Sequence, residues 1–324
     1  MEKRKNNIDY LKALAIIFVV LQHVNAYYVG NAMGSTIFFQ YVCNACSIIN
    51  VPVFVFCAGY LSREKAVKEY YYNRVNRVLV PFLVFAGLKL IYSFFISEKY
   101  AHGDSIAEQM FNTYVIGDVY WFCYAILLCC LCAPLLWQIK KNKTIRIIVL
   151  FMVVASVVVN HIVIVSDVIN VFQIFGFFEI FPFFVFGYIV KEHERFIDTY
   201  IERIGRKYWI GLLLIISILG MLIFLFIIHL WILKFLTSMA ITLTCKELFR
   251  NFSSNVIVQL LSKYSLQIMF LDSFYKAILF VFICRIIPLS IVSVLIVWVL
   301  DICLCVITCE IIKKIRYLRK LVGL

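Results

Sequence analysis

The first apolar stretch of the chain, residues 6–28, reads NNIDYLKALAIIFVVLQHVNAYY. It is long enough to cross a bilayer, because a spanning helix needs about 20 mostly apolar residues. Yet it contains Asp9, Lys12 and His23. Ionisable side chains are costly inside a membrane, and they usually face a cavity or another helix and have a function there. This stretch therefore predicts both the kind of fold and the place of a site.

The composition of the whole chain agrees with a membrane fold. Of its 324 residues, 64% are hydrophobic and only 15% are charged, and the mean hydropathy is +0.96. Soluble domains are roughly half apolar and a quarter charged. We therefore expect an all-α, polytopic protein of the lipid bilayer. The net charge of +13 does not indicate nucleic acid, since no basic face with interleaved aromatic residues is present.

The apolar runs predict about ten transmembrane helices in a single domain that covers residues 1–324. No soluble domain is inserted between them, and we find no repeat or low-complexity tract. The first run is too long and too polar at its end for a cleaved signal peptide. The expected spans are residues 8–28, 43–61, 78–97, 119–138, 146–166, 171–190, 208–228, 231–249, 264–283 and 289–311.

The basic residues between these spans predict the topology. Most of the 31 Lys and Arg residues fall at the N-terminus, in the even-numbered loops and in the C-terminal tail, whereas the odd-numbered loops hold essentially one, Lys99. Lys and Arg accumulate on the cytoplasmic side, so both termini are expected in the cytoplasm. Near His229 two expected spans meet with almost no loop between them. If residues 208–249 formed one span, the basic tail would lie outside, and this favours two.

The three ionisable residues of the first span share one side of the helix. Lys12 and His23 are eleven residues apart, which is close to three turns, and Asp9 comes three residues before Lys12. The other faces consist of Leu, Ile, Val and Phe. The topology places Asp9 and Lys12 near the cytoplasmic surface and His23 in the outer half. An acid, a base and an imidazole on one stripe predict a functional face.

Other polar residues in the spans have a simpler explanation. Snorkelling, helix ends or contacts between helices account for Lys89, Lys234, Lys276, Asp301 and Glu310. Most of the twelve cysteines lie in apolar runs, where cysteine packs as a small hydrophobe. Cys43 and Cys46 form a CxxC pattern, but no second pair or nearby histidine completes a metal site, so we expect no metal.

Several segments together resemble a known family. The pattern Ile-Asp-x-Leu-Lys-Ala-x-Ala, followed by a histidine eleven residues after the lysine, resembles the first helix of the integral-membrane acyltransferases, acyltransferase family 3. The Arg-x-x-Arg motif before a proline is found in YYYNRVNRVLVPF (70–82) as Arg74 and Arg77. Further similar segments, in order, are VPVFVFCAGYL (51–61), VYWFCYAILL (119–128), FPFFVFGYIV (181–190) and LSKYSLQIMFLDSF (261–274).

Two positions depart from the family pattern. The family usually has arginine where this chain has Lys12, and lysine keeps the charge but loses the bidentate geometry of the guanidinium. The late segment often ends in a histidine, whereas the matching region here offers Asp272. The second departure suggests a subfamily or a different acceptor.

The resemblance implies a membrane O-acyltransferase of the cytoplasmic (plasma) membrane. Such enzymes move an acyl group, commonly acetyl from acetyl-CoA, to a hydroxyl group of a glycan or lipid-linked sugar. A histidine suits this reaction as the base, or as a residue that is itself acylated, so we expect His23 to be catalytic with Lys12 and Asp9. Arg74 and Arg77 are candidates to bind the phosphates of acyl-CoA, or they only set the topology.

The remaining candidates and alternatives are less specific. Glu179 and Trp121 are predicted to line the cavity, although an inter-helix hydrogen bond and the interfacial aromatic belt would also explain them. A transporter or exporter of polysaccharide has similar features, but no pair of Gly/Pro-interrupted spans marks it. A catalytically inactive sensor or scaffold is a third hypothesis. The acceptor, the acyl group and the oligomeric state stay open.

Overall fold

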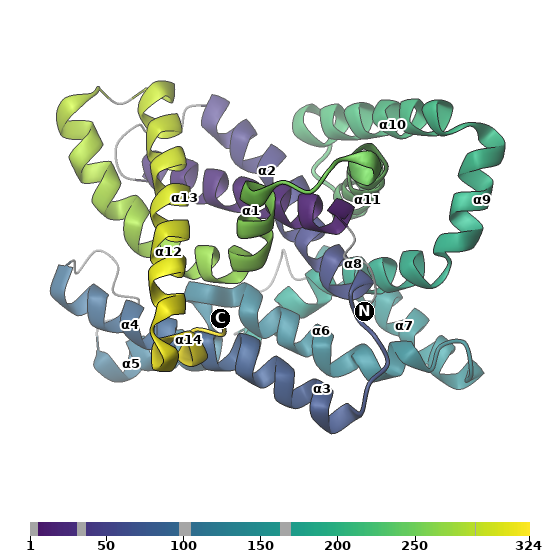
Figure 1. The fold of residues 1–324 in the computed structure, drawn as a ribbon, viewed down its shortest axis with the longest axis horizontal. Helices are drawn as coiled ribbons and strands as arrows, with labels where there is room; N and C mark the ends of the chain where they lie inside the picture. The colour runs from purple at the N-terminus through teal and green to yellow at the C-terminus, as the bar shows by residue number, and fades with distance from the viewer. Residues whose placement is uncertain (1–5, 31–36, 97–104, 163–169, 289) are drawn as a thin grey trace. The chain divides into compact units, whose positions relative to one another are not determined.

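A computed structural model of the chain describes residues 6–30, 37–96, 105–162, 170–288 and 290–324. Every regular element in these ranges is a helix (Figure 1), which confirms the all-α prediction. Lys3, Arg4, Lys5 and Lys99, which contributed to the predicted topology, lie outside the described residues.

Fourteen α-helices, with short π- and 3₁₀-helical segments between some of them, make up the described chain. They are α1 (Asn6–Tyr28), α2 (Ile37–Tyr60), α3 (Val67–Arg74), α4 (Val80–Ile96), α5 (Ile106–Phe111), α6 (Trp121–Trp137), α7 (Lys143–Ile162), α8 (Ile174–Glu192), α9 (Glu194–Ile204), α10 (Arg206–Phe226), α11 (Trp231–Leu248), α12 (Val256–Ile286), α13 (Ile291–Lys314) and α14 (Arg316–Leu321).

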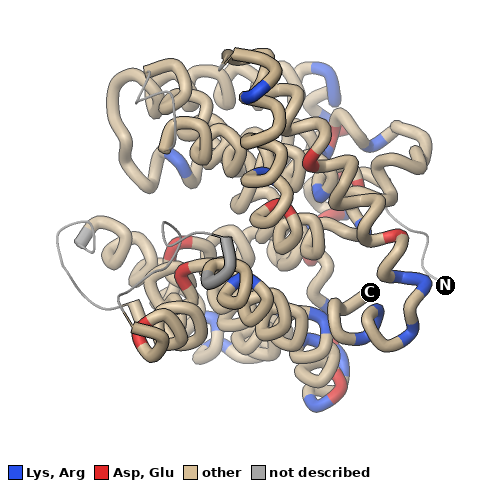
Figure 2. Tube along the Cα trace, turned by 90° about the vertical axis from the view of Figure 1, so that its left-hand side faces the viewer, with Lys and Arg blue, Asp and Glu red and all other residues tan. Residues whose placement is uncertain are grey.

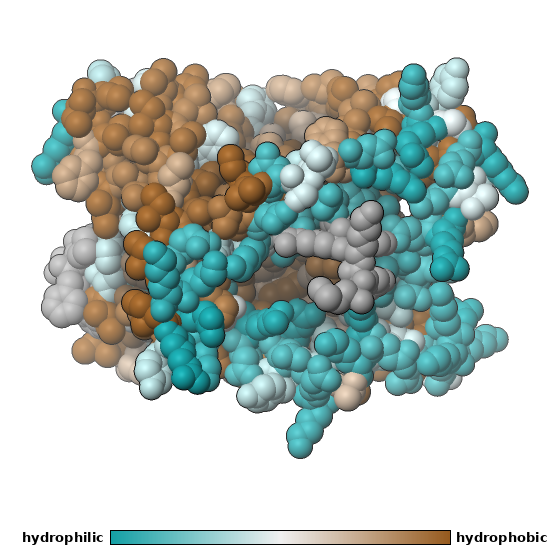
Figure 3. Space-filling model, in the orientation of Figure 1, coloured by the Kyte–Doolittle hydropathy of each residue, from teal (hydrophilic) through white to brown (hydrophobic). Residues whose placement is uncertain are grey.

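The long helices have the surface of membrane spans. Nine helices in the described ranges are long and apolar enough to cross a bilayer, and each matches a span expected from the sequence. Most of their length carries no charge (Figure 2). The surface over the second half of α12 and the first part of α13 is largely apolar (Figure 3), with Phe282, Ile286 and Val292 more than half exposed. Apolar side chains that would be unstable in water are expected where a helix faces lipid.

The helix α12 begins earlier than predicted. It starts at Val256 rather than at residue 264, because Asn255 caps it: the Asn255 side chain accepts hydrogen bonds from the backbone N–H groups of Ile257 and Val258. With 31 residues the helix is about 46 Å long, more than the hydrocarbon core of a bilayer requires. Its first two turns therefore extend beyond the apolar run that the sequence shows.

The described chain divides into two compact units. The first comprises residues 1–60 and 189–311, and the second comprises residues 61–188 and 312–324. Helices α1, α2 and α9–α12 belong to the first unit, and α3–α7 with α14 belong to the second. The prediction of a single domain over residues 1–324 is not tested by this division and stays a prediction.

Helix α1 is central to the first unit. It packs against α2 on one side and α12 on another. The buried Asn25 side chain donates a hydrogen bond to the carbonyl oxygen of Phe39 at 2.7 Å, and Trp298 of α13 donates its indole N–H to the carbonyl oxygen of Ile17 at 3.0 Å. The polar groups of α1 thus find partners on neighbouring helices, as a membrane interior requires.

Helices α1 and α12 run parallel to each other. In the first part of each helix, Ser262 donates a hydrogen bond to Asp9 at 2.6 Å. Further along both helices, His23 Nδ1 lies 2.6 Å from Asp272 Oδ2. Beyond that point the rings of Tyr28 and Phe280 meet edge to face, with centroids 4.7 Å apart. The residue numbers rise together on both helices, so both cross the membrane in the same direction.

This parallel contact decides the number of spans. Among the described residues, six of the nine apolar helices lie between α1 and α12 in the sequence. Six crossings would leave α12 antiparallel to α1, so a seventh segment must cross. That segment is α11, which corresponds to the span expected at 231–249 and is less apolar because it carries Lys234, Lys246 and Glu247.

The pairing of α10 with α11 supports the same conclusion. The two helices are separated only by residues 227–230 and form an antiparallel hairpin. A Cβ atom on Gly220 would lie 2.3 Å from Thr237 Oγ1, and Arg206 at the start of α10 pairs with Glu247 at the end of α11 at 3.5 Å. Because α11 returns along the full length of α10, the break near His229 separates two spans, as predicted.

Replacing Gly220 with alanine is expected to destabilise this hairpin by about 1–3 kcal/mol, because the new methyl group overlaps the buried Thr237 side chain. Gly211→Ala, on the same helix, is the matched control, since no atom lies within 4 Å of its added Cβ. Gly211→Ala should be neutral or stabilising by up to about 1 kcal/mol. Thermal unfolding in detergent measures both, and equal stability of the two variants would contradict the close contact.

Candidate functional site

The predicted stripe on α1 faces two different neighbours. Asp9 and His23 both contact α12, through Ser262 and Asp272. Lys12 is half-buried, and it interacts electrostatically with Cys57 of α2, as Asp9 also does. The structure therefore brings all three residues to the helix junctions of the first unit.

The contact between His23 and Asp272 has the geometry of a base held by a carboxylate. The Asp272 side chain is 1% exposed, whereas the His23 side chain is 39% exposed. With the proton of a neutral imidazole on Nδ1, that nitrogen donates to Asp272, and Nε2 keeps its lone pair. A carboxylate in this position fixes the orientation of the ring and stabilises the imidazolium ion that forms when Nε2 accepts a proton.

Lys276 belongs to the same cluster. Its Nζ lies 4.0 Å from Asp272 Oδ1, one helical turn further along α12. A carboxylate removed from water needs a cation or several hydrogen-bond donors to stay ionised. Here the imidazole and the ammonium group share that role for Asp272. Lys276 was explained from the sequence as a snorkelling residue, and its position next to Asp272 adds a second contribution.

The sequence did not reveal Asp272 as the partner of His23. Val256 and Asn6 begin the two helices, so Asp272 lies 16 residues into α12 and His23 lies 17 residues into α1 (272 − 256 and 23 − 6). Two residues at a similar depth on parallel helices can be predicted to meet. The sequence did not show this similarity, because the apolar run suggested that the helix starts at residue 264, which placed Asp272 only eight residues into the span.

The other predicted site residues belong to the second unit. Arg77 lies in a π-helical segment, Val75–Leu79, and Arg74 immediately precedes it. Single π-turns inside α-helices occur frequently at functional sites. The Arg74 guanidinium lies over the ring of Tyr70, 4.9 Å from its centroid, and Arg77 is exposed.

The C-terminal tail packs against this arginine motif within the second unit. Gly323 has a φ of +72°, and a Cβ atom there would lie 2.8 Å from Pro81 Cγ and 3.2 Å from the carbonyl oxygen of Arg77. Glycine is the residue that adopts this backbone conformation without strain and allows so close an approach. The tail therefore covers the backbone of the π-helical segment and leaves the Arg77 side chain exposed.

Trp121 and Glu179 are also brought towards one another. Trp121 packs on Gly176 of α8, because a Cβ atom at Gly176 would lie 3.1 Å from the indole ring. Gly176 and Glu179 are three residues apart and share one face of α8. The half-buried Glu179 and Trp121 thus lie on the same side of α8, and their predicted role in lining a cavity stays a prediction.

A metal centre has no counterpart in the described residues. No three His, Cys, Asp or Glu side chains come together there in an arrangement that could hold a metal ion. Cys43, from the CxxC pattern, lies 2.9 Å from the Asn25 side-chain nitrogen, and Cys46 is buried. In the structure, both cysteines therefore contribute to the packing of α2.

The comparison with protein families agrees with this arrangement. The sequence profile of an acyltransferase domain, that of acyltransferase family 3, matches residues 5–308. The chain belongs to acyltransferase family 3. It is therefore a multi-pass membrane enzyme that transfers acyl groups. No curated protein and no solved structure matches the chain.

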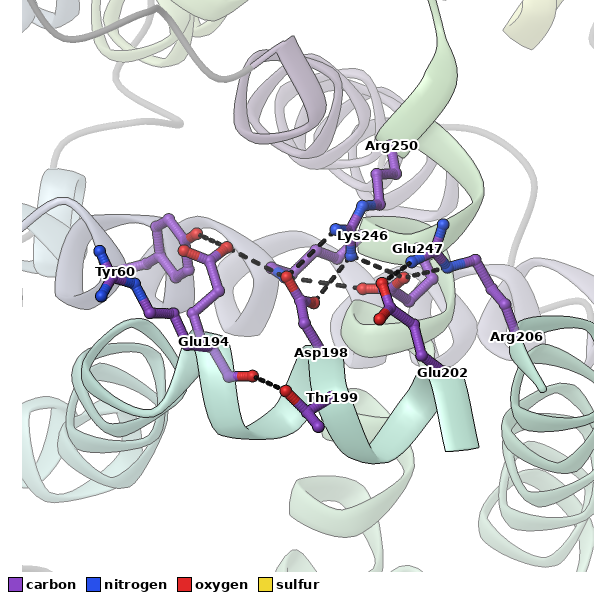
Figure 4. A network of polar contacts seen from close by, with 10 residues as sticks. Tyr60, Glu194, Asp198, Thr199, Glu202, Arg206, Lys246, Glu247 and Arg250 are labelled. Carbon is purple, nitrogen blue, oxygen red and sulfur yellow. Dashed lines mark hydrogen bonds and ion pairs between the residues drawn. The ribbon is translucent and has the colours of Figure 1, made fainter. Parts of the chain in front are cut away.

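This acyltransferase has a second polar cluster in its first unit (Figure 4). Glu194, Asp198 and Glu202 occupy one face of α9 at four-residue intervals, and Figure 4 shows them facing basic side chains of other elements. Glu194 accepts a hydrogen bond from Tyr60 of α2 and pairs with the buried Lys246 of α11 at 3.5 Å. The cluster links elements that are far apart in the sequence.

The centre of this network is buried and its edge is partly exposed. Glu247, 6% exposed, lies 3.5 Å from Arg206 and 3.6 Å from both Lys246 and Arg250. At the edge, Asp198 accepts two hydrogen bonds from Arg250 at 2.7 and 3.1 Å, and these raise the pKa of Arg250 above its ordinary value. Because each of its acidic side chains has a basic partner, the network holds α2, α9 and α11 together.

Replacing Lys246 with methionine should destabilise the enzyme by about 3–5 kcal/mol, because it removes the buried cation that pairs with both Glu194 and Glu247. Lys207→Met is the matched control: Lys207 is exposed, and its loss should change stability by less than about 0.5 kcal/mol. Thermal unfolding of both variants in detergent is the measurement. A Lys246→Met protein as stable as the control would show that the network contributes little.

Proposed function

We propose that this acyltransferase transfers an acetyl group from cytoplasmic acetyl-CoA to a hydroxyl group of a cell-surface glycan or lipid-linked sugar, with His23 as the base. The pairing of His23 Nδ1 with the buried Asp272 is the observation that supports this most directly. Nε2 takes no part in this contact, and because the His23 side chain is 39% exposed, a substrate hydroxyl can reach the ring. An enzyme that takes its donor from the cytoplasm and its acceptor at the cell surface must lie in the cytoplasmic membrane, and we place it there.

In this reaction, His23 first accepts a proton and then returns it. Nε2 takes the proton of the acceptor hydroxyl while its oxygen attacks the thioester carbonyl carbon. The C–S bond breaks as the tetrahedral intermediate collapses, and the imidazolium returns its proton to the leaving thiolate, which gives free CoA and the O-acetylated acceptor. Asp272 stabilises the imidazolium between the two proton transfers. If His23 is acylated itself, the same nitrogen carries the acetyl group from donor to acceptor.

The position of His23 agrees with an acceptor that approaches from outside. His23 lies 17 residues from the start of α1, which is about 26 Å along the helix and in the outer half of the membrane. Asp9 and Lys12 lie near its cytoplasmic end, where the donor enters. Lys12 lies eleven residues, or about 16 Å, before His23 along α1. We therefore propose that Lys12 contacts acyl-CoA where it enters, and that Asp9, held by Ser262, fixes the register of α1 against α12.

Substituting His23 with alanine should lower acetyl transfer by at least about 10²-fold, because general base catalysis contributes this much. Asp272→Asn should also lower it strongly, since asparagine does not stabilise the imidazolium. Thiol release from acetyl-CoA by purified protein, with a mixed glycan as acceptor, measures both. His161→Ala, which changes an exposed histidine of α7, is the control and should keep full activity. Normal turnover by His23→Ala would refute the role of His23 as the base. If the unaltered protein does not turn over acetyl-CoA at all, a transporter would be favoured.

The phosphates of acyl-CoA are assigned to Arg74 and Arg77 as a second part of the proposal. Arg77 is exposed on the π-helical segment, and a guanidinium pairs with phosphate through two hydrogen bonds. Arg77→Ala should raise the KM for acyl-CoA several-fold. Lys68→Ala, an exposed basic residue of the neighbouring α3, should not. Equal KM values for acyl-CoA in the two variants would show that Arg77 does not bind the donor and only sets the topology.

A further inference from the structure

Asp301 on α13 is a fully buried carboxyl group that the reaction described above does not use. It is 0% exposed. Its Oδ1 accepts a hydrogen bond from the Cys305 thiol at 3.3 Å, one turn further along the same helix, and no described residue hydrogen-bonds to Oδ2. A thiol is a weak donor. The carboxyl group thus has little to replace the water that an ionised carboxylate needs.

Asp301 faces the Asp272 cluster. The Cys305 thiol also lies 3.9 Å from the carbonyl oxygen of Ile268 on α12, so α13 packs closely against α12 at this level. Asp301 interacts electrostatically with Asp272 and Lys276 of α12. From α1, His23 completes the set through its contact with Asp272. The ionisable groups around Asp301 are therefore Asp272, Lys276, His23 and Cys305.

The charges of this cluster do not balance if both carboxyl groups are ionised and His23 is neutral. Lys276 then supplies one positive charge against two negative ones, inside a membrane protein and away from water. An uncompensated buried charge is costly, and such a group binds or releases a proton instead. One additional proton makes the cluster neutral. Asp301, Asp272 and His23 are the three groups that can bind it.

The hydrogen bonds favour Asp301 as the place of this proton. Asp272 has a ring N–H and an ammonium group beside it, which stabilise its ionised form. Asp301 has one thiol and an oxygen without a donor, so it gains most by becoming neutral. If His23 held the proton instead, Nε2 would have no lone pair, and Asp301 would remain a poorly solvated anion.

We propose that Asp301 is a positioning residue that is protonated in the resting enzyme and thereby keeps His23 neutral and available as a base. Its proton leaves Asp272 and Lys276 as a matched ion pair, against which the His23 ring is oriented. This deepens the proposed function, because it concerns the same histidine and rests on its role as the base. It also explains why a second carboxyl group is tolerated in the interior of the first unit.

Infrared difference spectroscopy tests the protonation state directly. At neutral pH the unaltered protein should show the carbonyl-stretch band of a protonated carboxylic acid, and the Asp301→Asn variant should lack it. Asp198→Asn is the matched control, because Asp198 pairs with Arg250 and is ionised, so its loss should leave the band in place. A band that is unchanged in Asp301→Asn would overturn the proposal.

Two further readouts keep the proposal testable. If Asp301→Asn does not fold, as judged by helical circular dichroism, Asp301→Glu should shift the band rather than leave it unchanged. In a folded Asp301→Asn protein, acetyl transfer should stay within about threefold of the unaltered enzyme, because an amide resembles the neutral acid in size and polarity. The spectra need no turnover, so they decide the state of Asp301 even if the assay refutes His23 as the base.

Discussion

The structure of the first unit depends on the side-by-side, parallel contact of α1 and α12. In a membrane, apolar surface gives no net preference for another helix over lipid, so polar contacts and close packing decide which helices associate. Here one hydrogen bond near the starts of the two helices, between Ser262 and Asp9, and one at greater depth, between His23 and Asp272, fix both the direction and the register of the pair. The proposed active site is the deeper of these two contacts.

The same contact links the site to the topology of the chain. Two parallel helices require an odd number of crossings between them, and α11 supplies the last of these despite its three charged residues. Its charges are accommodated because Lys246 and Glu247 enter the ion-pair network with α9 and α10 instead of facing lipid. The parallel contact of α1 and α12 therefore requires α11 to cross the membrane, and the network at the end of α11 makes that crossing possible.

Much of the fold could be predicted from the sequence, because apolar runs and basic loops are local signals. The ten spans, the break near His229 and the stripe of Asp9, Lys12 and His23 needed no knowledge of which helices pack together. The partner of His23 could not be predicted in this way. It depends on the Asn255 cap, which sets the start of α12, and on a contact between residues 249 positions apart. The burial of Lys246 could not be predicted either, because it belongs to a network that forms only when α2, α9 and α11 meet.

Cysteine cross-linking of α1 to α12 is the most direct test of this account. Pairs placed at 9 and 262 and at 23 and 272 should each be joined by a short thiol-specific reagent, with the linked peptides identified by mass spectrometry against the background of native cysteines. The exchanged pairs, 9 with 272 and 23 with 262, are separated by about 15 Å or more along the helices and should not react. Linkage of the exchanged pairs, or failure of both expected ones, would contradict the parallel contact and the site built on it.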